Sequence, residues 1–269
     1  MDLSLVGPGR AGLALALASR AAGHRIAGVL ARDPVSAAAA GERLDAPVLA
    51  WDAPLPSCDL VLVAVRDDSI ATVARRLAGH VAAAGGVVHL SGLTPVDALA
   101  GLGCPIGSFH PLQTLPTPES GAERLVGAWI AVTTDDDMLA DILFALASSL
   151  GAHPFELADE QKPLYHAAAA AAANFPLASL AMAERLFTAA GIDFAVAGPL
   201  VSAVVANAVT MGPRAALTGP VARGDVGTVR AQVAAVAAAD PEMLGHFVAM
   251  IRATAAIAGT SDAIEAALS

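Results

Sequence analysis

Apolar runs and helix-prone segments alternate along the first 156 residues of the chain. Runs typical of buried strands lie at residues 3–6, 25–31, 59–65, 86–92, 105–109, 129–133 and 152–155. Alanine- and leucine-rich segments with helical patterns lie between several of them, for example at 34–44 and 135–150. Strands that alternate with helices predict a doubly wound sheet of the α/β class.

After about residue 156 the strand patterns stop. Helical patterns cover residues 160–190, 193–211, 226–239 and 242–258, and glycines and prolines separate them. We therefore predict two domains, an α/β domain over 1–156 and an all-α domain over 157–269. The uncharged stretch 194–213 is interpreted as a buried helical element rather than a membrane span, because Pro199 and Asn207 interrupt it.

The first strand leads into a glycine-rich loop, Gly7-Pro8-Gly9-Arg10-Ala11-Gly12, before a helical pattern. Three glycines at this spacing allow a tight turn, a close approach of backbone amides to a pyrophosphate, and close packing of helix on strand. The helix N-terminus adds unpaired N–H groups that attract the anion. The alternative is a plain glycine-rich turn. We predict that the loop binds a dinucleotide cofactor.

The end of the second strand bears on the choice of cofactor. Folds that prefer NAD usually carry an acidic residue there, whereas this chain has Ala31 followed by Arg32. A guanidinium suits a 2′-phosphate, so NADP is preferred over NAD. Asp33 follows directly, and a solvated Arg–Asp pair before a helix is the alternative. Val65 and Arg66 end the third strand and are expected near the nicotinamide half.

Charge and cysteine content narrow the class of protein. The net charge of −10, without a basic run, argues against a nucleic-acid partner. Cys58 and Cys104 lack the spacing of metal ligands, so no metal site is predicted. They are expected to be buried thiols in a reducing cytoplasm. No signal-peptide pattern begins the chain, and no membrane association is expected.

Two stretches carry candidate catalytic residues. His110 is expected just past a strand end, where it either binds a substrate oxygen or only pins the loop, while His89 is expected to be structural. Lys162 and His166 share one face of the first long helix, and Asn174 lies about 12 Å further along its axis. The alternative for this second set is an alanine-rich packing helix.

The turn 216–225 is dense in glycine and proline and contains Arg223. A guanidinium there can clamp a substrate carboxylate through two hydrogen bonds. The alternative is a turn between helices in which Asp225 caps the next helix and pairs with Arg223.

Together these stretches resemble bacterial proteins that join a Rossmann-like domain to a domain of unknown function called DUF2520. The resemblance is carried by the glycine-rich loop and by the motifs at 65–70, 89–92, 108–114, 165–168, 174 and 217–225. The motif at 89–92 includes Ser91, and the resemblance implies that Ser91 binds the cofactor. The chain departs from the family at Arg66, where proline is usual, and at Gln232, where histidine is common.

The layout is also similar to ketopantoate reductase, pyrroline-5-carboxylate reductase and β-hydroxyacid dehydrogenases. The last group carries a lysine followed four residues later by asparagine, which Lys162 and His166 match with histidine in place of asparagine. The His-Pro pair at His110 is similar to that of prephenate dehydrogenases. These resemblances imply an NADP-dependent reductase of a small 2-oxo or imino acid that forms a homodimer through its C-terminal helices. The alternative is a non-catalytic NADP(H)-binding sensor or partner-binding protein.

Overall fold

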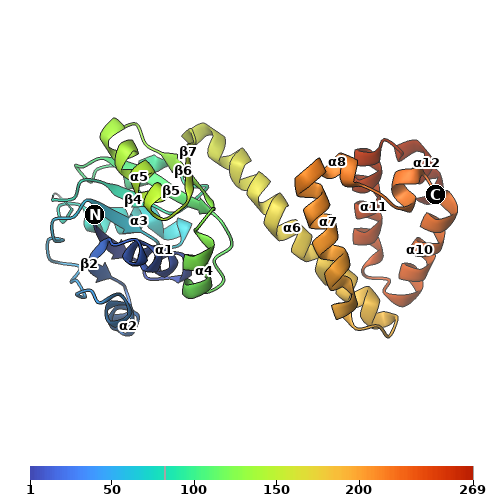
Figure 1. The fold of residues 1–269 in the computed structure, drawn as a ribbon, viewed down its shortest axis with the longest axis horizontal. Helices are drawn as coiled ribbons and strands as arrows, with labels where there is room; N and C mark the ends of the chain where they lie inside the picture. The colour runs from blue at the N-terminus through green and yellow to red at the C-terminus, as the bar shows by residue number, and fades with distance from the viewer. Residues whose placement is uncertain (82, 269) are drawn as a thin grey trace. The chain divides into compact units, whose positions relative to one another are not determined.

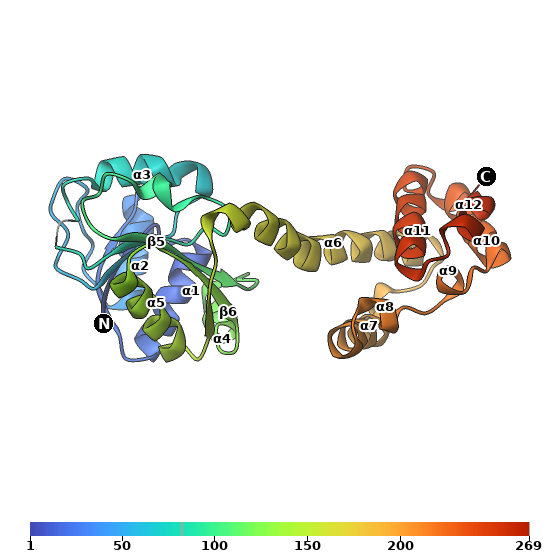
Figure 2. The same cartoon turned by 90° about the horizontal axis from the view of Figure 1, so that it is seen from above.

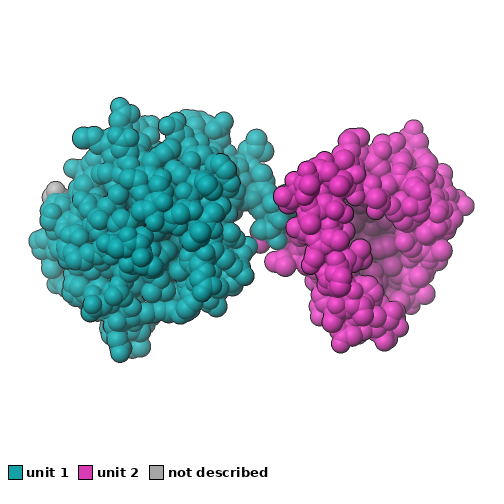
Figure 3. All heavy atoms as spheres, in the orientation of Figure 1, with its two compact units in different colours: residues 1–173 teal, residues 174–269 magenta. Residues whose placement is uncertain are grey.

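The computed structural model describes residues 1–81 and 83–268, which form two compact units, Met1–Ala173 and Asn174–Ser269 (Figure 3). The first unit is built on a seven-stranded sheet of order β2-β1-β3-β4-β5-β6-β7. Its strands are β1 (Asp2–Val6), β2 (Arg25–Leu30), β3 (Leu60–Val63), β4 (Val87–His89), β5 (Ile106–Leu112), β6 (Trp129–Thr133) and β7 (His153–Glu156). Strands β1 to β5 are parallel, whereas β6 is antiparallel to β5 and parallel to β7.

Helices cover both faces of this sheet (Figures 1 and 2). They are α1 (Arg10–Ala21), α2 (Pro34–Leu44), α3 (Ile70–Leu77), α4 (Pro118–Arg124) and α5 (Asp137–Ser149), with short 3-10 turns η1 (Asp67–Ser69), η2 (Val96–Leu99) and η3 (Asp159–Gln161). The sequence of β3 is apolar throughout because both faces of the strand are buried. Leu60 and Leu62 pack into the core that includes α1 and α5, while Val61 and Val63 pack into the core under α3.

The second unit is helical. Helix α6 (Lys162–Ala189) begins in the first unit and ends in the second. It is followed by η4 (Phe194–Ala197), α7 (Gly198–Met211), α8 (Pro213–Ala216), α9 (Pro220–Arg223), α10 (Val226–Ala239), α11 (Leu244–Ala258) and α12 (Ser261–Leu268). A small core of Val229, Ile251, Ala255, Ile264 and Ala267 joins α10, α11 and α12. The fold class predicted from the sequence, a doubly wound α/β sheet followed by an all-α region, is confirmed.

Three local expectations need correction. Helix α4 was not expected, and Thr117 caps it with Pro118 at its first turn. Strand β5 extends to Leu112, so His110 lies within a strand and pairs with Ala131 of β6, not past its end. The segment Phe194–Met211 is helical but only 6% of it is buried within the chain, so it is not a buried element; by length and composition alone it is long enough to cross a membrane.

The predicted boundary at residue 156 coincides with the end of β7. The first compact unit continues to Ala173 and therefore includes the first part of α6. Lys162, Tyr165 and His166 thus belong with the sheet, whereas Asn174 and Arg223 belong to the second unit.

Candidate functional site

The glycine-rich loop connects β1 to α1 and has the backbone that its sequence predicts. Gly7 has a φ of +86°, and a Cβ there would lie 2.6 Å from Val65 Cγ1. A Cβ on Gly12 would lie 2.6 Å from Ala64 Cβ, so α1 can approach β3 closely only with glycine here. Around Gly9 a Cβ would approach no described atom closer than 4.0 Å. The chain itself therefore does not need glycine at position 9, which fits a loop kept open for a ligand.

A cavity of about 390 Å³ lies beside this loop, at the carboxyl ends of β1, β2 and β3. Gly7, Pro8, Gly9, Arg32, Val65 and Arg66 all line it. Six of the ten residues predicted to bind the cofactor thus surround one cavity, and the first helical residues Arg10, Ala11 and Gly12 follow directly in α1. A dinucleotide needs a helix N-terminus facing an open cavity, and these residues supply both.

Trp51 forms a wall of the same cavity, and the sequence patterns did not single it out. Its indole Nε1 donates a hydrogen bond to the Ala31 carbonyl oxygen, 2.8 Å away. The Arg76 guanidinium lies 4.2 Å from the centre of its ring, so the indole is held from one side by a cation–π contact. An isolated tryptophan in a loop gives no periodic signal, and only its place in the fold shows its role.

Arg32 and Asp33 differ in what they contact. The Asp33 carboxylate accepts hydrogen bonds from the Ser36 hydroxyl and backbone N–H, which lower its pKa and cap helix α2. Arg32 is exposed at the cavity and has no hydrogen-bond or ion-pair partner among the described residues. Arg32 and Asp33 thus make no direct ion pair, although the nearby Arg32 charge adds to the lowering of the Asp33 pKa, and the Arg32 guanidinium is available to an anion.

The adjoining strands bring further side chains to the same edge of the sheet. Val63, His89 and Ser108 are in register across β3, β4 and β5. Residues two positions further along, Val65, Ser91 and His110, consequently follow at the same edge. Ser91 is buried, and its hydroxyl accepts hydrogen bonds from the N–H groups of Leu93 and Thr94 at 3.1 and 2.9 Å. It shapes the loop after β4.

His89 is fully buried and both of its ring nitrogens are occupied. Nε2 donates to the Pro95 carbonyl oxygen at 3.3 Å, and Nδ1 accepts from the Ser91 N–H at 3.2 Å. Burial, with a smaller contribution from Lys162, lowers the pKa of His89 to about 4. These bonds agree with a structural role for His89 in holding the loop after β4.

His110 is the centre of a cluster of aromatic and imidazole rings. Its Nδ1 lies 2.8 Å from the Tyr165 hydroxyl, and its ring centre lies 6.4 Å from that of His166. Burial, followed by the nearby His166, lowers the pKa of His110 to about 4. His110 is therefore a neutral imidazole near pH 7, and it can donate or accept a hydrogen bond without carrying charge.

Lys162 begins α6 and its side chain is only 1% exposed. Its Nζ lies 2.6 Å from Asp159 Oδ1 and donates to the Thr94 carbonyl oxygen at 3.0 Å. Burial lowers its pKa, while the contact with Asp159 opposes that shift. The bond to Thr94 thus joins α6 to the loop after β4, and the contact with Asp159 joins it to the turn η3 directly before the helix.

Asn174 and Arg223 are both exposed residues of the second unit. Arg223 ends α9, and the Asp225 carboxylate accepts from the Thr228 N–H and hydroxyl as the cap of α10. The capping part of the alternative reading therefore applies to Asp225. A substrate contact of Arg223 stays a prediction.

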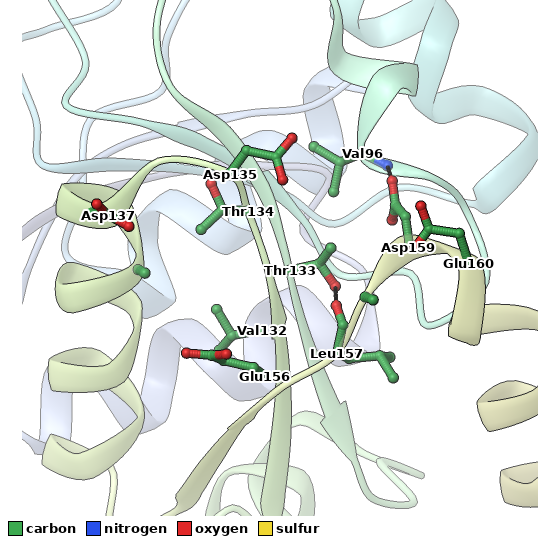
Figure 4. A pocket seen from close by; sticks show the side chains of 12 residues that line it. Val96, Val132, Thr133, Thr134, Asp135, Asp137, Glu156, Leu157, Asp159 and Glu160 are labelled. Carbon is green, nitrogen blue, oxygen red and sulfur yellow. Dashed lines mark hydrogen bonds between the residues drawn. The ribbon is translucent and has the colours of Figure 1, made fainter.

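A second cavity in the first unit, of about 460 Å³, is acidic (Figure 4). Asp135, Asp137, Glu156, Asp159 and Glu160 all line it. Asp159 is tied to the Lys162 ammonium and to the Val96 N–H, which donates to Oδ2 at 2.8 Å. A cavity with this many carboxylates repels phosphates. The smaller cavity beside the glycine-rich loop is accordingly the one suited to a dinucleotide.

Comparisons with known proteins agree with this geometry. The family described as Rossmann-like domain matches residues 1–111, and the family described as domain of unknown function DUF2520 matches residues 128–254. No curated protein matches the chain in sequence.

Solved structures share the fold over nearly the whole chain. One is from Bacteroides fragilis and described as a proposed NADP oxidoreductase, with 24% identity, a TM-score of 0.81, and coverage of 95% of this chain and 98% of that one. A protein from Thermotoga maritima is 25% identical, with a TM-score of 0.79 and coverage of 96% and 99%. An imine reductase from Myxococcus stipitatus in complex with NADP+ is 17% identical, with a TM-score of 0.67 and coverage of 98% of both chains. With both family matches in place, the chain belongs to the proteins that combine a Rossmann-like domain with a DUF2520 domain.

Proposed function

We propose that the protein is an NADP-dependent reductase of a C=O or C=N bond in a small molecule, with a 2-oxo acid or an imino acid as substrate. The observation that carries the proposal is the pairing of an open glycine cradle with a neutral, half-buried His110 at the same sheet edge. The similarity in fold to an imine reductase that binds NADP+ supports it.

The residues of the cradle fit the cofactor. The N–H groups at the start of α1 would hold the pyrophosphate, and the unpaired Arg32 would hold a 2′-phosphate. When bound, the cofactor supplies a hydride to an electrophilic carbon. His110 would donate a hydrogen bond to the substrate oxygen or nitrogen, which gains electron density as the carbon is reduced. His166 is exposed nearby and is a second candidate donor, and Arg223 is the candidate for the substrate carboxylate.

Oxidation of NADPH, followed by its absorbance with a panel of 2-oxo acids and cyclic imines, tests the activity. Turnover of at least one class is expected. Tight NADPH binding without oxidation on any of them would refute the reductase and favour the sensor alternative.

Cofactor preference is tested separately. A charge-assisted bidentate contact contributes about 1.5–3 kcal/mol, so Arg32→Ala is expected to weaken NADPH binding roughly 10- to 100-fold. NADH binding should stay within about twofold, because NADH lacks the 2′-phosphate. Arg75→Ala is the matched control, since Arg75 is exposed on α3 and its hydrogen bond is to Thr72. Equal losses for both cofactors would refute the role of Arg32.

We further propose that the protein is a homodimer that buries the apolar surface of α6 and α7. Large apolar side chains are exposed there, at 64% for Phe175, 64% for Leu200, 57% for Val204 and 82% for Val209. Exposed apolar surface of this kind is typical of protein–protein interfaces. Light scattering should give a dimer for the wild type and a monomer for Val204→Asp. Val126→Asp, at a position 70% exposed in the first unit, should remain dimeric. A monomeric wild type would refute the proposal.

The reducing cytoplasm is the proposed location. Both cysteines, Cys58 and Cys104, are free thiols, and the pKa of each is raised by burial, which keeps them unreactive.

A further inference from the structure

One hydrogen bond joins the sheet to the start of α6 at the candidate site. His110 on β5 and Tyr165 on α6 are 55 residues apart in sequence, with Nδ1 and the hydroxyl oxygen 2.8 Å apart. Their rings meet edge to face, with centres 5.6 Å apart. Within the part of the chain that the structure describes, the Tyr165 hydroxyl is the only hydrogen-bond partner of the His110 ring. Tyr165 is also the only tyrosine in the sequence.

The surroundings hold both rings in place. A Cβ on Gly92 would lie 2.7 Å from His110 Cε1 and 2.8 Å from both ring nitrogens, so the loop after β4 lies against the imidazole. Phe155 of β7 packs against the Tyr165 ring with centres 6.0 Å apart. The hydrogen bond therefore connects two rings that packing has already oriented.

The chemistry of the two groups sets the direction of the bond. A phenol is a stronger acid than a neutral imidazole N–H, and an imidazole nitrogen is a stronger base than a phenol oxygen. Burial raises the pKa of Tyr165 to about 12 and lowers that of His110 to about 4, so both are neutral near pH 7. The Tyr165 O–H then donates to Nδ1, and a neutral imidazole that accepts at Nδ1 carries its proton on Nε2.

We propose that Tyr165 is a positioning residue: it fixes His110 as the Nε2–H tautomer, and this N–H donates to the substrate oxygen or nitrogen that is reduced. The inference rests on the proposed reductase function and assigns His110 and Tyr165 their roles in it. As the carbon gains hydride, the π-electron pair moves to the oxygen or nitrogen, which takes the Nε2 proton. The phenol proton passes to Nδ1 as Nε2 loses its own. Water then protonates Nε2, and the Nδ1 proton returns to the Tyr165 phenolate oxygen, which restores the Nε2–H tautomer.

Nitrogen NMR of the protein tests the tautomer without any substrate. In the wild type, His110 Nδ1 is expected to have the shift of an unprotonated nitrogen and Nε2 that of a protonated one, with His110→Phe identifying the signals. Tyr165→Phe removes only the hydroxyl and should bring the two shifts closer together, because both tautomers become populated. Phe155→Leu loosens the packing but keeps the hydroxyl, and should leave the shifts apart. Unchanged shifts in Tyr165→Phe would overturn the proposal.

The single tyrosine gives a second signal. The phenolate absorbance of the wild type should appear with a midpoint near 12, as expected for a buried phenol. In His110→Phe the midpoint should fall, because the neutral phenol loses its acceptor. A midpoint that does not move would count against a bond donated by Tyr165.

Turnover is the last readout. Tyr165→Phe should lower kcat roughly 10- to 100-fold, while its Kd for NADPH stays within about twofold. Wild-type kcat in Tyr165→Phe would overturn the positioning role. If the wild type reduces no carbonyl or imine, the proposed function fails and the role in reduction fails with it. The nitrogen shifts still decide whether Tyr165 sets the tautomer, so the two failures are told apart.

Discussion

Replacement of Lys162 by methionine separates a structural from a catalytic role for the only lysine in the chain. Methionine keeps the apolar stem of the buried side chain and removes the ammonium that contacts Asp159 and the Thr94 carbonyl oxygen. Among the described residues, Asp159 then keeps the Val96 N–H as its one hydrogen-bond donor. A carboxylate without its counter-ion is left at the junction of α6 and the loop after β4.

The size of the effect follows from burial. Removing one partner of a buried ion pair costs about 3–5 kcal/mol. The Asp159 side chain is 32% exposed, so water solvates part of its charge. We therefore expect Lys162→Met to lower the free energy of unfolding by about 2–3 kcal/mol. Adding Asp159→Asn, which keeps an acceptor for Val96, should restore roughly half of that loss.

Urea unfolding followed by tryptophan fluorescence is the assay. Trp51 and Trp129 both lie in the first unit, so the signal follows the unit that contains Lys162. The midpoint should fall while the slope stays constant. If Lys162→Met unfolds at the wild-type midpoint but loses turnover, the ion pair with Asp159 does not stabilise the fold. Lys162 would then act in the chemistry, as the resemblance to β-hydroxyacid dehydrogenases implies.

Two further predictions concern pH and the glycine-rich loop. His89 and His110 have pKa values lowered to about 4 by burial, against about 6.5 when unfolded, so the unfolded chain binds more protons between these values. Their contribution is complete above pH 6.5 and falls by about 1.4 kcal/mol per pH unit for each histidine as the pH drops to 4. His89→Gln should reduce the slope of the unfolding free energy against pH by about 1.4 kcal/mol per pH unit between pH 4 and 6.5. An unchanged slope in urea unfolding would contradict this. Gly7→Ala should weaken NADPH binding at least about tenfold, because its Cβ would displace Val65, as followed by NADPH fluorescence. Gly101 has the same φ of +86°, and a Cβ added there would meet no atom within 4 Å. A comparable loss of NADPH binding in Gly101→Ala would therefore show that backbone strain, and not the contact with Val65, weakens binding.

The elements that the sequence predicted well are those that local pattern determines. The predicted helix 34–44, strand 129–133 and helix 226–239 coincide with α2, β6 and α10. In each case a cap, a proline or an apolar run marks the ends within the segment itself, as with Asp33 and Pro34 at the start of α2. The glycine-rich loop belongs to the same group, because its spacing directly specifies its backbone.

What the sequence did not predict depends on distant contacts. His110 lies inside β5 because β6 pairs with β5 in the antiparallel direction. The residues next to His110 do not indicate that pairing. Tyr165 reaches the same ring from α6 across 55 residues. Trp51 becomes a cavity wall through its bond to Ala31, and an isolated tryptophan has no periodicity to detect. Local sequence patterns specify the segments, whereas tertiary packing determines which side chains meet.

The buried His89 and the half-buried His110 show why partial or full burial alone does not identify a catalytic group. His89 and His110 have the same direction of pKa shift, for the same principal reason, and lie on neighbouring strands. His89 has a protein partner on each ring nitrogen, so it has no donor or acceptor left for a substrate. His110 has one partner in the described chain, on Nδ1, which leaves Nε2 for a ligand. The unpaired nitrogen, rather than the shifted pKa, distinguishes the candidate donor from the structural residue. It follows that a second hydrogen-bond partner for His110 Nε2 in the free protein would remove the physical basis for its role.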